Sequence, residues 1–229
     1  MLLHYLREQS CYMIHTVIFD LDGVIMDSEP VHFMLEKQMF EELKIAVPFE
    51  EHNSYVGMSS ENMWETIVNK HNLIYSAKNL VQKKHELYLK HLLGEENVYP
   101  IRGVAELIKD LYKNNFILTV ASSSPLEVID AVLKKFDLSK YFIATVSGTE
   151  LIHSKPHPEI FLRAAEFANC EPRECIVIED SENGVTAAKA AGMKCIGFLN
   201  PNSGVQNLNN ADVIIKSFEE LNVDFIRSF

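Results

Sequence analysis

Cysteine is scarce in this chain, and its few cysteines do not form a recognisable framework. Among 229 residues there are four, Cys11, Cys170, Cys175 and Cys195, and no CxxC pair occurs. Small disulfide-stabilised secreted domains carry cysteines at much higher density. We therefore expect reduced thiols in a protein located in the cytoplasm.

Positive charge is in the minority. The chain has 21 lysines and arginines against 32 aspartates and glutamates, which gives a formal net charge of −11. Proteins that bind nucleic acid broadly neutralise its phosphates with basic residues, so we expect no nucleic-acid partner. A small phosphorylated substrate is compatible with an acidic chain, because one lysine and a metal ion can reverse the field locally.

Long hydrophobic runs are also absent. No run reaches the ~20 residues that a transmembrane helix needs, so we expect no membrane partner. Residues 1–16 lack the compact apolar segment of a signal peptide. Residues 1–12 precede the first predicted strand, and we interpret them as an extension or as the result of a misplaced start.

The sequence does contain short apolar runs that alternate with helical patterns. Hydrophobic residues make up 47% of the chain, which is enough for a core domain and one smaller module. The apolar runs of strand length are 17–19, 117–121, 144–146, 175–178, 195–198 and 213–215. Because buried parallel strands form continuous apolar runs, we predict an α/β fold whose parallel sheet is covered by helices on both faces.

One region interrupts this alternation. Residues 30–98 contain helical patterns and no convincing strand. The segment 99–103 contains proline and glycine and is typical of a turn that leads back into the α/β region. We predict an all-helical insert at residues 30–98 and a core domain formed by residues 1–29 and 99–229.

Two aspartates follow the first predicted strand. Asp20 and Asp22 stand two apart, and Gly23 comes directly after the second. Ligands of open α/β sheets bind at the carboxyl ends of strands, and two carboxylates held there need a cation such as Mg²⁺. Two aspartates at this spacing, without further motifs, usually belong to a polar turn. An EF-hand is excluded, because its glycine stands at the sixth loop position.

Three more polar motifs occur farther along the chain. Ser122 follows the strand at 117–121, Glu179 and Asp180 follow the strand at 175–178, and Lys155 lies in a proline-flanked loop. Each motif has an ordinary explanation: a helix cap, an acidic helix start and a solvated lysine. Hydroxyl groups and free backbone N–H groups at a strand end can also bind phosphate.

These motifs together resemble those of the haloacid dehalogenase-like superfamily. Residues 20–24, with Asp27 and Ser28, resemble its first motif, and residues 27–32 resemble the β-phosphoglucomutase-like subfamily. The other motifs follow in the family's order. The resemblance implies a Rossmann-like core with a helical cap inserted after the first strand, which agrees with the insert predicted at residues 30–98.

The resemblance also implies a role for each motif residue. It implies phosphoryl transfer through an aspartyl-phosphate, with Asp20 as the nucleophile and Asp22 as the general acid and base. The implied phosphate-binding residues are Ser122, Ser123 and Lys155, and the implied Mg²⁺ ligands are Asp20, Asp22, Glu179 and Asp180. Asp22 favours an oxygen leaving group, since the dehalogenases of the family lack this second aspartate.

Four cap residues are candidate substrate contacts by the same resemblance: His32, Gly57, Ser60 and Lys84. In β-phosphoglucomutases an arginine grips the second phosphate of the substrate, and Ser60 takes the matching position here. No arginine occurs in residues 30–98, which counts against a mutase that must hold a bisphosphate. Lys84 either compensates in part or is a solvated helix residue. His32 either serves the site or has a hinge or packing role.

We therefore expect a monomeric, Mg²⁺-dependent phosphatase whose partner is a small phosphorylated substrate, a sugar phosphate in the first place. The alternative enzyme is a phosphotransferase of the β-phosphoglucomutase type, which converts β-glucose 1-phosphate to glucose 6-phosphate. A binding protein on an inactive scaffold is a third hypothesis, but no catalytic group of the family is missing. Nucleotide and pseudouridine phosphates stay open as substrates, because the core contacts only the phosphate.

Overall fold

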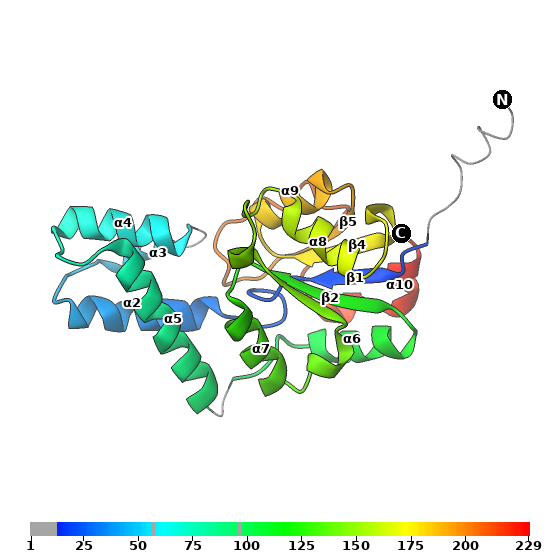
Figure 1. Ribbon diagram of the computed structural model, residues 1–229, viewed down its shortest axis with the longest axis horizontal. Coiled ribbons are helices and arrows are strands. Elements are labelled where there is room, and N and C mark those ends of the chain that lie inside the picture. The colour runs from blue at the N-terminus through cyan, green and yellow to red at the C-terminus, as the bar shows by residue number, and fades with distance from the viewer. Residues whose placement is uncertain (1–12, 56–57, 96–97) are drawn as a thin grey trace, which may run out of the picture.

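A six-stranded parallel sheet forms the centre of the molecule (Figure 1). The computed structural model describes residues 13–55, 58–95 and 98–229. The sheet has the strand order β3-β2-β1-β4-β5-β6. Its strands are β1 (Thr16–Phe19), β2 (Ile117–Ser122), β3 (Ala144–Ser147), β4 (Cys175–Glu179), β5 (Lys194–Phe198) and β6 (Val213–Ile215). All six predicted strands are confirmed, and no bound differs by more than one residue.

The register of the sheet decides which residues meet at its edge. Strand β1 lies between β2 and β4, and Phe19 is paired with Val120 on one side and Ile178 on the other. Because the three strands are parallel, their carboxyl ends point the same way. The residues that follow Phe19, Val120 and Ile178 therefore lie side by side at the carboxyl end of the sheet.

Helices cover both faces of the sheet, as predicted. Figure 1 shows α8 and α9 on one face, and α6 and α7 on the other. Side chains of a strand alternate between faces, so in β1 Val17 and Phe19 join one apolar cluster and Ile18 joins the other. The core helices are α6 (Val104–Lys113), α7 (Leu126–Lys135), α8 (Glu159–Phe167), α9 (Glu182–Ala190) and α10 (Val223–Arg227).

The segment after β1 forms a separate group of helices beyond one end of the sheet (Figure 1). These are α2 (Glu29–Glu42), α3 (Phe49–Asn53), α4 (Ser60–His71) and α5 (Ala77–Gly94). They bury an apolar cluster of their own around Trp64, which is fully buried. The regular elements that the structure describes in this region are all helices, and its assignment to residues 30–98 as a separate domain stays a prediction.

None of the helices described is both long enough and apolar enough to cross a membrane. The longest of them, α5, has polar or charged residues around much of its surface, with Lys78, Lys83 and Lys90 all exposed.

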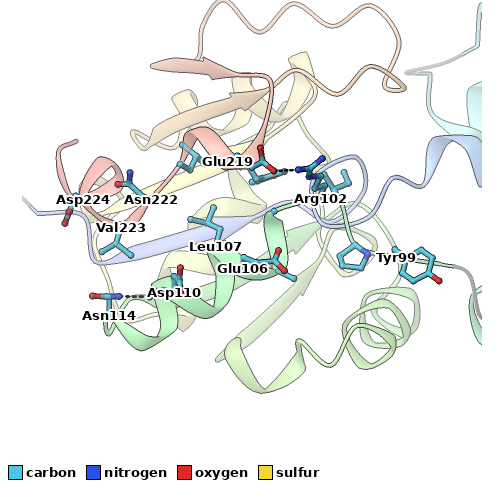
Figure 2. Close-up of a pocket in the computed structure, with 16 residues that line it drawn as sticks. Tyr99, Arg102, Glu106, Leu107, Asp110, Asn114, Glu219, Asn222, Val223 and Asp224 are labelled. Atoms are coloured by element: carbon cyan, nitrogen blue, oxygen red, sulfur yellow. Dashed lines mark hydrogen bonds and ion pairs between the residues drawn. The ribbon is translucent and has the colours of Figure 1, made fainter.

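A large surface cavity lies away from the strand ends (Figure 2). Its volume is about 840 Å³, and it is enclosed by α6 and the segment around Phe218 and Val223. Arg102 and Glu219 form an ion pair of 2.8 Å at its rim. No residue that the sequence proposes for the site lines this cavity.

The helical cap should lose stability when its buried cluster is opened. Ile67 is fully buried in the cluster that contains Trp64, so Ile67→Ala should lower the free energy of unfolding by ~2–5 kcal/mol. Trp64 is the single tryptophan of the chain, and its fluorescence during urea unfolding measures the change. The exposed neighbour Glu65→Ala is the control, expected within ~0.5 kcal/mol of wild type. Equal stability of the two variants would contradict this packing.

Candidate active site

Asp20 and Asp22 lie at the carboxyl end of β1. The Asp20 N–H donates to the Ile178 carbonyl at 3.0 Å, which extends the ladder by one residue and fixes the backbone. Gly23 follows with φ +76°, and a Cβ at this position would lie 1.9 Å from Asp180 Oδ2. Only glycine fits this close approach of two strand ends. Burial, opposed by the nearby Lys155, raises the pKa of Asp20 to about 7.

Lys155 lies at the centre of the carboxylate cluster. Its Nζ donates to Asp20 Oδ1 and Glu179 Oε1, both at 2.7 Å, and to the Ala121 carbonyl at 3.2 Å. The side chain is 7% exposed. Burial alone would lower the pKa of this ammonium, but the Asp20 and Glu179 carboxylates outweigh it and hold the pKa above its usual range. Lys155 is therefore a permanent cation in the site.

Glu179 and Asp180 come from the end of β4. Glu179 Oε2 accepts hydrogen bonds from the N–H of Ser181 at 2.8 Å and from its hydroxyl at 2.9 Å. A Cβ on Gly184 would lie 1.7 Å from Glu179 Oε1, so α9 can approach only with glycine there. Asp180 accepts a hydrogen bond from Ser203 Oγ. Burial, together with the charges of Glu179 and Asp20, raises the pKa of Asp180.

The three buried carboxylates are suited to hold a metal ion. One oxygen each of Asp20, Glu179 and Asp180 lies within 4.8 Å of the others. Burial in the first place, and then the neighbouring carboxylates, raises the pKa values of Asp20 and Asp180. The ammonium of Lys155 bonds two of the three carboxylates, Asp20 and Glu179. Oxygen ligands of this kind bind hard divalent cations, so the donor set fits such an ion.

The serines after β2 face Asp22. Ser122 Oγ is 3.3 Å from Asp22 Oδ2, and Ser124 Oγ donates to the same oxygen at 2.6 Å. The Ser124 N–H in turn donates to Ser122 Oγ at 3.0 Å. No role is predicted for Ser124 from the sequence. It is the third of three consecutive serines, 122–124, and a serine before a helix is ordinarily explained as a helix cap.

The structure brings the proposed core residues to one cavity. The cavity has a volume of about 360 Å³. Its lining includes Asp20, Asp22, Ser122, Ser123, Lys155, Glu179 and Asp180. Together these side chains and strand ends form a concave site with one fixed cation, several carboxylates and several hydroxyl groups.

A second cavity of about 180 Å³ separates Asp22 from the cap. His32, Ser60 and Lys84 line it, whereas Gly57 lies outside the described residues. Lys84 is 5% exposed, so the alternative of a solvated helix residue is wrong. Its ammonium bonds Glu36 Oε1 at 2.5 Å and Ser60 Oγ at 3.1 Å. Glu36 is not predictable from the sequence, because its partner Lys84 is far away in the chain.

The His32 ring packs 4.4 Å from the Tyr88 ring at the same cavity. Burial, and then the neighbouring Lys84, lowers the pKa of His32 to about 4. The imidazole is therefore neutral at physiological pH.

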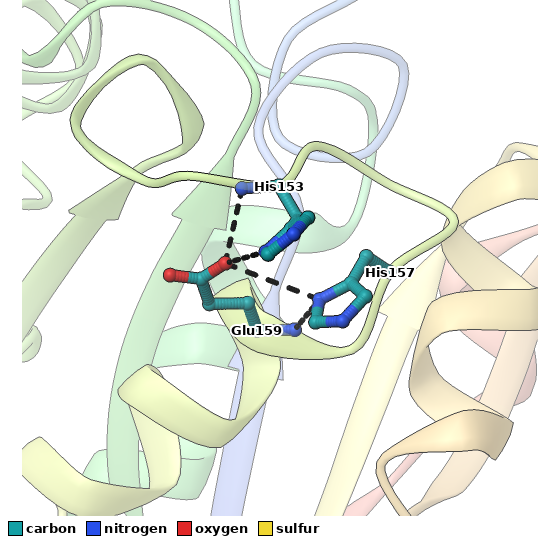
Figure 3. A group of neighbouring side chains, drawn as sticks. All are labelled: His153, His157 and Glu159. Atoms are coloured by element: carbon teal, nitrogen blue, oxygen red, sulfur yellow. Dashed lines mark hydrogen bonds and ion pairs between the residues drawn. The ribbon is translucent and has the colours of Figure 1, made fainter.

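A further group of potential metal ligands lies on the exposed loop around Lys155 (Figure 3). His153 Nδ1 is 2.9 Å from Glu159 Oε2, and the rings of His153 and His157 are stacked 4.3 Å apart. No role is predicted for these two histidines from the sequence. Glu159 also accepts the His153 N–H at 3.0 Å, so it ties the loop to the start of α8.

Comparison with known proteins identifies the family. The family model described as haloacid dehalogenase-like hydrolase matches residues 17–198, from the second residue of β1 to the end of β5. The chain belongs to this hydrolase family. It is an enzyme by that membership, and the predicted resemblance is confirmed.

Several relatives match along most of the chain. It is 32% identical over 201 residues to the phosphorylated carbohydrates phosphatase of Thermotoga maritima, with 88% of this chain and 90% of that one covered. The identity to the beta-phosphoglucomutase of Bacillus subtilis is 31%, with 92% of each chain covered. The structure of a beta-phosphoglucomutase from Clostridium difficile superposes with a TM-score of 0.78 at 28% identity, covering 94% of this chain and 96% of that one. The chain is thus about equally similar in sequence to a phosphatase and to a mutase, and this similarity does not decide between the two activities.

Removal of the central cation should destabilise the fold in a pH-dependent way. Lys155→Met leaves Asp20 and Glu179 buried without their partner, which should cost ~3–5 kcal/mol. A buried carboxyl whose pKa lies above its unfolded value takes up a proton on folding, so its cost grows as the pH rises. Denaturant unfolding without divalent cations should show a larger loss at pH 8 than at pH 6.

The exposed Lys134→Met is the matched control for this experiment. It should change the free energy of unfolding by no more than ~0.5 kcal/mol at either pH. A loss for Lys155→Met that is as small as that of the control, or that does not depend on pH, would contradict the charge balance described here.

Proposed function

We propose that this protein is a Mg²⁺-dependent phosphatase that hydrolyses a small phosphate monoester, a sugar phosphate in the first place, through an aspartyl-phosphate. The observation that carries the proposal is the position of Lys155 between Asp20 and Glu179, next to an Asp22 that two serine hydroxyls hold in place. Asp20, Asp22 and Lys155 line one cavity, which supports roles for them as nucleophile, acid–base group and fixed cation.

Asp20 is the nucleophile. Lys155 binds its Oδ1, which leaves Oδ2 to form a bond to phosphorus while the bond from phosphorus to the alkoxide oxygen breaks. Lys155 lies where it also offsets negative charge on the phosphoryl oxygens. Ser122 and the backbone of Ser123 complete the phosphate-binding edge at the end of β2.

Asp22 is the general acid and base. Its Oδ2 is fixed by Ser122 and Ser124, while its Oδ1 is buried and has no hydrogen-bond partner. A proton on Oδ1 goes to the leaving alkoxide in the first step. The resulting carboxylate then takes a proton from the water that attacks phosphorus, which releases phosphate and restores Asp20.

Asp20, Glu179 and Asp180 would hold Mg²⁺, with the backbone carbonyl of Asp22. When bound, the ion supplies positive charge that neutralises the carboxylates and the phosphoryl group. This assignment is supported by three buried carboxylates whose oxygens lie within 4.8 Å of one another, two of which share the ammonium of Lys155.

The cap favours hydrolysis over mutase activity. Residues 30–98 contain no arginine, and Ser60 accepts a hydrogen bond from the buried Lys84. A mutase must retain its bisphosphate and return the phosphoryl group to it, which demands strong anion binding in the cap. Names of relatives agree with hydrolysis of phosphorylated carbohydrates and hexitols.

Product analysis tests the proposal. With Mg²⁺ and β-glucose 1-phosphate or a panel of sugar phosphates, we expect free phosphate to accumulate without glucose 6-phosphate. Asp20→Asn should lose at least ~1,000-fold in kcat, because covalent catalysis needs its carboxylate. The exposed Asp130→Asn on α7 should retain wild-type activity.

Two results would contradict the proposal. Formation of glucose 6-phosphate ahead of free phosphate would instead establish the phosphotransferase. Turnover by Asp20→Asn at the rate of Asp130→Asn would exclude the aspartyl-phosphate route.

A further inference from the structure

The cavity between Asp22 and the cap is built for a polar ligand. It is the cavity of about 180 Å³ described above. Asp22 and His32 line it, and each has one buried atom without a hydrogen-bond partner, Asp22 Oδ1 and His32 Nδ1. Buried polar atoms normally find a partner, so these two indicate hydrogen-bonding groups of a ligand at this place.

The only ammonium that lines this cavity among the described residues is already neutralised. Lys84 Nζ contacts Glu36 Oε1 at 2.5 Å. The other oxygen of Glu36 is 2.7 Å from His52 Nε2. Burial alone would raise the pKa of Glu36, but its hydrogen bonds with His52 and Lys84 hold the pKa below the usual range. Glu36 is thus an anion that balances Lys84.

The rest of the lining adds negative charge and no free positive charge. Asp22 contributes a carboxyl group, and burial raises the pKa of Glu29 to about 7, so part of it is ionised at neutral pH. His32 is neutral, since burial lowers its pKa to about 4. A phosphate or carboxylate entering this cavity would meet carboxylates without a cation to pair with, which is costly for a buried charge.

Hydroxyl groups, in contrast, find both donors and acceptors. An ammonium has three N–H donors, and Lys84 uses two of them for Glu36 and Ser60. The carboxyl oxygens of Glu29 and Asp22 can accept hydrogen bonds. A dry cavity of about 150 Å³ admits a six-membered ring such as benzene, so this one has room for the body of a sugar or a sugar alcohol.

We propose that this cavity selects phosphate monoesters whose body is uncharged and polyhydroxylated, and that Glu36 imposes this choice by neutralising Lys84. The inference rests on the proposed phosphatase function and adds its substrate class. Glu36 is a specificity-determining residue here, because it sets the charge that the non-phosphorylated end of the substrate meets. Bisphosphates and phosphorylated sugar acids are rejected.

The test compares glucose 1-phosphate with glucose 1,6-bisphosphate, and follows phosphate release for each. For the wild type we expect kcat/KM to favour the monophosphate at least ~10-fold. Glu36→Gln keeps the shape of the side chain but leaves the Lys84 charge unbalanced. It should shift the ratio of the two kcat/KM values toward the bisphosphate by ~10-fold or more, mainly through a lower KM for the bisphosphate.

The matched control is Glu41→Gln, on the same helix α2 but exposed. It should leave the ratio unchanged, because the exposed charge is screened. Should Glu36→Gln fail to fold, as judged by thermal unfolding, the double variant Glu36→Leu/Lys84→Met removes both charges together. It should keep the wild-type preference, since a cavity with neither charge still gives the second phosphate no cation.

Each contrary outcome has a distinct meaning. Equal kcat/KM for the two substrates in the wild type would overturn the inference, and so would a Glu36→Gln ratio equal to that of Glu41→Gln. In both cases the protein would still be a phosphatase. Absence of hydrolysis of all substrates, including p-nitrophenyl phosphate, would overturn the proposed function and this inference with it.

Discussion

The ammonium of Lys155 holds together a group of carboxylates that could not otherwise be buried at one place. It contacts Asp20 and Glu179 at 2.7 Å each, and these residues come from β1 and β4. Two neighbouring strands thus present negative charge to the same lysine. Unpaired buried carboxylates are costly, so the position of the Lys155 loop and the charge state of the cluster depend on each other. In the reaction proposed here, the same cation would offset the charge that develops during phosphoryl transfer.

The cap also contains a buried lysine that is paired with a carboxylate. Glu36 and Lys84 form a buried pair on α2 and α5, and His52 from α3 holds the second oxygen of Glu36. This pair neutralises the ammonium of Lys84 at the cavity that Asp22 also lines. In the function proposed here, Lys155 and carboxylates suited to a metal ion bind the phosphate, whereas the cap offers neutral donors and acceptors to the rest of the substrate. Specificity then follows from charge balance as well as from shape.

The sequence predicted the sheet and the core of the site because both depend on short stretches of chain. Each strand is a continuous apolar run, and Asp20, Ser122 and Glu179 belong to the ends of strands that pair in parallel. The pairs within the cap could not be predicted in this way. Glu36 and Lys84 are far apart in the chain. Helix periodicity identifies the apolar face of a helix, but it does not show which of the polar residues beside that face is buried. Burial of Lys84 therefore became visible only in the packed structure.

A direct measurement of the covalent intermediate tests the central claim, that Asp20 receives the phosphoryl group. The Asp22→Asn variant lacks the base that activates water, so it should accumulate the intermediate from p-nitrophenyl phosphate, whose leaving group needs no protonation. After mixing with Mg²⁺ and p-nitrophenyl phosphate and quenching in acid, peptide mass spectrometry should find one phosphoryl group on the peptide that contains Asp20. Release of phosphate with no modification of that peptide at any time point, in this variant or in the wild type, would contradict the account.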